Sequence, residues 1–171
     1  MLTRLQKIAA RIDRLNDVIG HTVSWLTLTM VLVTCAVVIA RYLFGAGSIA
    51  LQESVMYMHG TTFMLGIAFT LKEQGHVRVD VLYERFTERT RAVIEMMGTV
   101  LFLVPISAFI FWNSLEYVTF SWSLSESSAQ PGGLPGVYLL KTLIPAMAGL
   151  LLLQGTAEFL KAMIKIRGNN R

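Results

Sequence analysis

A charged stretch in the middle of the chain, residues 72–91, separates long apolar segments on either side. It holds five Lys or Arg residues and four Asp or Glu residues. Placing one Arg or Asp at the centre of a bilayer costs roughly 2.5 to 3.5 kcal/mol, and this stretch would place several there together. We therefore interpret residues 73–91 as a polar hinge that lies in water or among the lipid headgroups and joins two membrane hairpins.

The composition assigns the chain to the integral membrane proteins. Of its 171 residues, 54% are apolar and only 15% are charged, which is too apolar for an ordinary soluble domain of this size. The net charge of +4 does not indicate nucleic-acid binding, because the basic residues lie in short flanks beside apolar runs. That pattern favours contact with anionic membrane lipid. The single cysteine, Cys35, excludes a disulfide within the chain.

Four apolar segments are long enough to cross a bilayer. A hydrocarbon core of about 30 Å needs roughly 20 residues of helix, and the segment that begins at Val18 runs for 23 residues without a formal charge. The Ser, Gly and Pro residues of 121–136 predict an exposed loop, and Pro105 predicts a kink in the helix before it. The predicted membrane-spanning helices are 18–44, 53–72, 92–120 and 137–164.

The N-terminal segment, residues 1–17, is predicted to form a short amphipathic helix on the inner membrane surface. Apolar residues recur in it at spacings of three and four, and basic residues stand between them. The apolar positions are Leu2, Leu5, Ile8, Ile12 and Leu15, and the basic ones are Arg4, Lys7, Arg11 and Arg14.

The distribution of basic residues predicts the orientation. The N-terminal flank, the hinge and the C-terminal tail hold 13 of the 15 Lys and Arg residues, and only Arg41 and Lys141 fall on the other side. Four spans with both termini in the cytoplasm satisfy the positive-inside rule. The predicted fold is therefore a single all-α membrane domain, residues 1–171, made of two transmembrane hairpins with a cytoplasmic hinge at 73–91 and a periplasmic loop at 121–136.

The sequence does not predict an enzyme. It contains no Gly-rich phosphate loop, no paired catalytic carboxylates and no metal-ligand spacing, and the glycines at 132–136 are typical of turns. We expect no catalytic residue, no cofactor and no metal. Arg41 and Glu53 flank the tight turn of the first hairpin, so we expect them to pair across that turn or to face a partner protein.

Two free-standing functions stay open as alternatives. A haem-binding anchor needs two histidines that meet one iron, whereas His21 and His59 are predicted to differ in membrane depth by more than about 10 Å. A small proton-coupled exporter needs an acidic residue inside a span, and the first predicted span contains none. A chain without a site of its own is instead typical of an accessory subunit.

Valines alternate with polar residues at the start of the hinge. In an extended segment, alternate residues share one face. The polar face would then form a row that docks against the ends of the hairpins, and this row consists of His76, Arg78 and Asp80.

The same hinge residues, Gly75 to Leu82, resemble the G-H-[IV]-R-V-D signature of the small membrane subunit of TRAP transporters, the tripartite ATP-independent periplasmic carriers. Arg41-Tyr42-Leu43-Phe44 is similar to the R-Y-[LVI]-F motif at the end of that family's first span. Glu53 matches the acidic residue that opens the second span. Pro135 and Pro145 match prolines before and within the fourth.

The resemblance extends from about Asp17 to Phe159, and the loop at 127–135 resembles the branch labelled mannitol or chloroaromatic. It implies a complex in the bacterial inner membrane, where a periplasmic binding protein delivers an organic acid to a large sodium-driven permease subunit. The large subunit would carry the substrate and sodium sites. This chain would pack beside it as a scaffold, in contact with membrane lipid.

Overall fold

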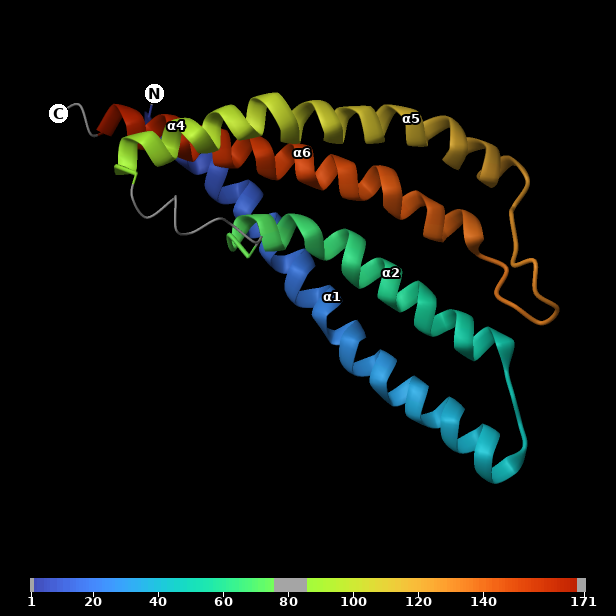
Figure 1. Cartoon of the computed structure of the whole chain (residues 1–171). Helices are drawn as coiled ribbons and strands as arrows, with labels where there is room; N and C mark the ends of the chain where they lie inside the picture. Colours follow the sequence, from blue (N-terminus) through green and yellow to red (C-terminus); the bar gives the residue numbers. More distant parts are fainter. Residues whose placement is uncertain (1, 76–85, 169–171) are drawn as a thin grey trace.

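The computed structural model describes residues 2–75 and 86–168, and every regular element in these ranges is a helix (Figure 1). This confirms the predicted all-α class for the described part of the chain. The elements in order are α1 (Leu2–Phe44), α2 (Ile49–Lys72), α4 (Glu88–Gly98), the π-helical turn η1 (Thr99–Leu103), α5 (Val104–Ser123) and α6 (Val137–Gly168).

α6 lies at the centre of the fold, where it contacts α1 and α2 on one side and α4 and α5 on the other. α1 packs against α2, and α5 packs against α6. The turn after α1 and the loop after α5 lie at one end of the molecule, which we call the loop end (Figure 1). The N-terminal end of α1, the last turn of α2 and the C-terminal end of α6 lie toward the other, which we call the termini end.

The buried core consists mainly of small residues. Alanines on α1, α2, α4 and α6 are buried, whereas large apolar side chains such as Trp25, Phe109 and Trp112 are mostly exposed. Small residues at helix contacts and large apolar residues facing outward are typical of proteins surrounded by lipid. The fully or nearly buried alanines are Ala9, Ala68, Ala92, Ala148, Ala157 and Ala162.

The N-terminal segment corrects one prediction. In the described part of the predicted segment 1–17, residues 2–17 do not form a separate short helix, because they are the first part of α1, which runs without a break for 43 residues. The segment contains no Gly or Pro that would end the helix. Its apolar residues Ile8 and Leu15 are about half exposed, whereas the polar Asn16 is only 1% exposed. The segment therefore buries a polar face against the rest of the protein.

The third predicted span differs at its start, and its helix changes geometry just before Pro105. α4 begins at Glu88, with the Thr87 hydroxyl capping it by accepting a hydrogen bond from the Thr90 N–H, so the first turn falls inside the predicted hinge. Pro105 has no N–H and its ring crowds the preceding turn. The helix widens just before it, where the Val104 N–H donates to the carbonyl of Thr99 across a π-helical turn.

Three helical stretches in the described part of the chain are long and apolar enough to cross a membrane: Arg4–Phe44, Glu88–Ser123 and Val137–Ile166. α2, with 24 residues, is not among them. The chain is therefore a membrane protein with three spans evident from length and composition.

Candidate functional site

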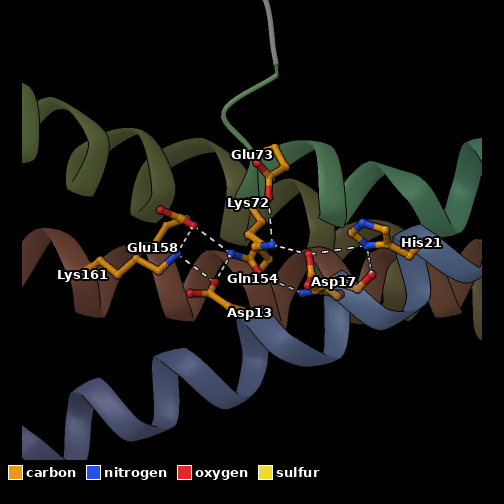
Figure 2. A network of polar contacts seen from close by, with 9 residues as sticks. Asp13, Asp17, His21, Lys72, Glu73, Gln154, Glu158 and Lys161 are labelled. Carbon is orange, nitrogen blue, oxygen red and sulfur yellow. Dashed lines mark hydrogen bonds and ion pairs between the residues drawn. The ribbon is translucent and has the colours of Figure 1, made fainter.

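Two groups of polar contacts join parts of the chain that are distant in sequence. The first joins α1 to α6 (Figure 2), and we call it the α1–α6 network; it consists of Asp13, Asn16, Gln154, Glu158 and Lys161. The second, which we call the loop clasp, lies at the loop end and consists of Glu53, Ser128 and Leu134.

Gln154 is the centre of the α1–α6 network, and its side chain is fully buried. Its Oε1 accepts a hydrogen bond of 2.7 Å from Asn16 Nδ2. Its Nε2 donates to Asp13 Oδ1 at 2.9 Å and to Glu158 Oε1 at 2.8 Å. Both N–H groups and the carbonyl of the amide are therefore used within the protein, as burial requires.

Lys161 supplies the cation that two carboxylates share. Its Nζ lies 2.8 Å from Asp13 Oδ1 and 2.8 Å from Glu158 Oε1. Because both carboxylates can only accept, they fix the Gln154 amide with its NH₂ toward them and its carbonyl toward Asn16. The network thus gives α1 one defined position along α6.

A second ion pair on the same face of α1 reaches α2. Lys72 Nζ lies 2.5 Å from Asp17 Oδ1 and 2.8 Å from Glu73 Oε1 (Figure 2). One turn further along α1, the His21 ring packs in a T-shaped arrangement on the Phe69 ring, with 5.4 Å between the ring centroids. Since Asp17 follows Asn16 directly, α1 is attached to both α6 and α2 within about one helical turn.

The loop clasp begins with a tight turn in the loop after α5. The Gly133 N–H donates to the carbonyl of Gln130 at 3.0 Å, and Gly132 has φ +78, as expected for position i+2 of a type II turn that follows Pro131. This arrangement confirms the turn expected from the glycines. The Ser128 N–H then closes the loop on the carbonyl of Leu134 at 3.1 Å.

Glu53, in the second turn of α2, holds this loop. Its Oε1 accepts a hydrogen bond from the Ser128 hydroxyl, and its Oε2 accepts one of 2.6 Å from the Leu134 N–H. Charge-assisted bonds of this kind are about twice as strong as bonds between neutral groups. A single carboxylate therefore connects the first hairpin to the loop of the second.

Glu126 fastens the other side of the loop. Ser125, just after α5, has φ 47, and the chain turns there so that the Glu126 N–H donates to the carbonyl of Ser121 at 3.1 Å. Glu126 Oε2 lies 2.5 Å from Lys141 Nζ and 2.5 Å from the Ser121 hydroxyl. The hydrogen bond from Lys141, followed by that from Ser121, holds the pKa of the Glu126 carboxyl below its ordinary value. The Lys141 ammonium also lies 4.1 Å from the centre of the Tyr117 ring.

Substitution of Gly133 tests how closely the loop packs against Glu53. A Cβ at this position would lie 2.6 Å from Ser128 Cβ and 2.8 Å from Glu53 Oε1, so Gly133→Ala is expected to open the loop clasp. Limited proteolysis at residues 124–136 should become severalfold faster. Gly47→Ala, in the turn after α1 with nothing within 4 Å of its Cβ, is the matched control. Equal protease resistance of both variants would show that the clasp does not order the loop.

The predicted site residues are distributed as follows. Glu53 lies in the loop clasp and accepts hydrogen bonds from the loop, and no ion pair joins it to Arg41, which is exposed on the last turn of α1. Pro135 is exposed just before α6, and Pro145 is buried within α6. The three hinge candidates lie outside the described residues: His76, Arg78 and Asp80.

Sequence reasoning missed the role of Asp13 and Asn16, because it placed their segment on the membrane surface. A signal was present in the polar residues of the two segments: Asp13 and Asn16 are three residues apart, and Gln154, Glu158 and Lys161 follow at spacings of four and three. Such spacings place polar groups on one helix face. Only the fold shows that the two faces meet.

Comparison with known proteins adds the identity of the family. A family model described as "Tripartite ATP-independent periplasmic transporters, DctQ component" matches residues 30–164, more than three quarters of the chain. The matched range includes the loop clasp, Gln154 and Lys161, whereas Asp13 and Asn16 lie before it. No curated protein and no solved structure gives a significant match. The chain belongs to the family of DctQ components of the tripartite ATP-independent periplasmic transporters.

Proposed function

We propose that this chain is the small scaffold subunit of a TRAP transporter and packs against the large, sodium-driven permease subunit that imports an organic acid. A periplasmic binding protein would deliver that acid. Membership of the DctQ family supports this proposal, since it is a family of transporter components and not of enzymes. The loop at 127–135 supports a place in the branch labelled mannitol or chloroaromatic.

The observation that supports the scaffold role is that Gln154 and Glu53 form their hydrogen bonds within this chain. A polar or charged residue within a membrane helix is a candidate for substrate or ion handling. Here the buried amide of Gln154 bonds to α1 and to its own helix, and the Glu53 carboxylate bonds to the loop. Both groups therefore serve to hold the helices of this chain together.

We also propose that α2 crosses the membrane, which gives four spans. Its 24 residues extend about 36 Å at 1.5 Å per residue. The hydroxyls of Thr61, Thr62 and Thr70 donate to backbone carbonyls at 2.8, 2.9 and 3.1 Å, which reduces the cost of placing them in lipid. α2 also lies against α1 and α6, two of the evident spans.

The proposed orientation places both termini and the hinge in the cytoplasm, because 13 of the 15 basic residues lie there under the positive-inside rule. In a Cys35→Ser background, we expect a cysteine at Ser127 to react with an impermeant maleimide on intact spheroplasts. A cysteine at Thr87, exposed before α4, should react only after lysis. The reverse pattern would invert the orientation.

Reconstitution tests the proposed function. A large TRAP permease subunit co-expressed with this chain should co-purify with it in mild detergent. Proteoliposomes should take up the organic acid only when both subunits, the loaded binding protein and a sodium gradient are present. Full uptake by the large subunit without this chain would contradict the proposal. So would absorbance of the purified chain at about 400 nm, which indicates haem, or proton-coupled transport by this chain alone.

A further inference from the structure

The face of α5 that points away from α6 carries polar residues within a membrane span. The buried residues of α5 are Ser107, Ser114, Val118 and Ser121, and their spacing of three, four and seven marks the side that packs on α6. At about 100° per residue, Glu116 lies on the opposite side of the helix. It is exposed there, within the Glu88–Ser123 span.

Glu116 is accompanied by other polar side chains along this face. Asn113 and Ser123, one turn before it and two turns after it, are also exposed. Together with their neighbours they line a shallow hollow of about 650 Å³. We call this hollow the α5 groove, and its lining residues are Asn113, Glu116, Tyr117, Thr119, Phe120 and Ser123.

Glu116 differs from the other acidic residues at the loop end. Glu53 bonds to Ser128 and Leu134, and Glu126 forms an ion pair with Lys141. The Glu116 carboxylate has no hydrogen bond or ion pair with any residue that the structure describes. The groove therefore presents a negative charge for which the described chain supplies no cation.

Asn113 also has unused hydrogen-bonding capacity. Its Nδ2 donates to the carbonyl of Phe109 on the same helix at 2.9 Å, which leaves one N–H and the amide oxygen free for another group. Glu116 is seven residues before Ser123 at the end of α5, which is about 10 Å along the helix axis. A carboxylate and an amide on the outer face of a membrane span are costly to expose to hydrocarbon.

We infer that the α5 groove is the docking surface for a helix of the large permease subunit that presents a Lys or Arg to Glu116 and a hydrogen-bonding side chain to Asn113. This inference rests on the proposed function. The groove runs along the last turns of a candidate membrane span, so a neighbouring membrane helix can lie against its whole length. The exposed rings of Phe109, Trp112 and Phe120, 64% to 77% exposed, provide apolar contact around the polar centre.

Charge reversal tests the inference in the co-expressed complex. Glu116→Lys should lower the amount of large subunit recovered with this chain by about tenfold or more, because the new ammonium would face the cation of the large subunit and repel it. Glu116→Gln removes the charge without reversing it and should lower recovery less. Ser127→Lys places the same charge in the exposed loop and should leave recovery unchanged. Changing the facing Lys or Arg of the large subunit to Glu should restore recovery with Glu116→Lys.

Photo-crosslinking in the otherwise unchanged complex provides a test that does not depend on the folding of the charge variants. A benzoylphenylalanine at Thr119, within the α5 groove, should capture the large subunit. Capture of lipid alone, or recovery of the Glu116→Lys complex at the wild-type level, would show that this face lies against lipid and would overturn the inference while the proposed function stands. If the unchanged chain recovers no large subunit, the proposed function fails and the inference fails with it.

Discussion

Replacing Gln154 with Leu should destabilise the protein by about 2 to 4 kcal/mol, because it leaves buried polar groups without partners. Asn16 would lose the acceptor for its Nδ2, and it is only 1% exposed. Its Oδ1 already has no hydrogen-bond partner, so the whole amide would be buried unpaired. Asp13 and Glu158 would each lose one donor, although Lys161 would still bind both.

The double variant Asn16→Leu/Gln154→Leu should be less destabilised than the sum of the two single variants. Removing both partners of a buried hydrogen bond is far less costly than removing one, so the double-mutant cycle should give a favourable coupling of about 1 to 2 kcal/mol between the two positions. Resistance of the chain to SDS in mixed micelles measures the effect. Gln6→Leu, at an exposed position of α1, is the control. If Gln154→Leu matched Gln6→Leu, the network would not stabilise the fold.

Replacing Gly20 with Ala should separate α1 from α2 and lower the stability by about 1 to 3 kcal/mol through overpacking. A Cβ at Gly20 would lie 2.3 Å from Cγ and 2.6 Å from Cβ of Phe69. Because these atoms are close to the backbone of α2, rotation of the ring cannot relieve the contact. The Phe69 ring also contacts His21 at 5.4 Å and the Lys72 ammonium at 5.3 Å, so both contacts should weaken.

Gly66→Ala provides the matched comparison for Gly20→Ala. Gly66 lies in the same hairpin, and a Cβ there would meet nothing within 4 Å. Alanine should therefore be neutral or stabilise α2 by up to about 1 kcal/mol through its higher helix propensity. The same SDS titration compares the two variants. Equal stability of both would mean that α1 and α2 do not pack closely at Gly20.

The helices could be predicted because the bilayer imposes their length, but the start of α1 could not. The pattern of Leu and Ile between Arg and Lys in residues 1–17 is the same for a helix on the membrane surface and for the start of a longer one. What distinguishes the two is the contact of Asn16 with Gln154, which is 138 residues away. Sequence spacing carries no information on which two helix faces meet.

At the loop end too, the sequence predicts the local turn but not the contact between distant segments. Pro131 and Gly132 predict their turn, because proline fixes one backbone angle and glycine allows a positive φ. The partner of Glu53 could not be predicted, and the expected pair with Arg41 relied on their closeness in the chain. The structure instead brings the loop of the second hairpin to Glu53, where a hydroxyl and a backbone N–H supply its hydrogen bonds. The groups that bind the Glu53 carboxylate therefore depend on how the two hairpins pack.

The most direct test of the scaffold role is the transport rate per assembled complex when the α1–α6 network is made apolar. Proteoliposomes with the Asn16→Leu/Gln154→Leu variant should match the wild type within about twofold in maximal rate, in half-saturation by the loaded binding protein and in sodium dependence, once rates are divided by the amount of complex. A normal amount of complex with transport reduced by about tenfold or more, or with altered sodium dependence, would show that these residues take part in transport and would contradict the scaffold role.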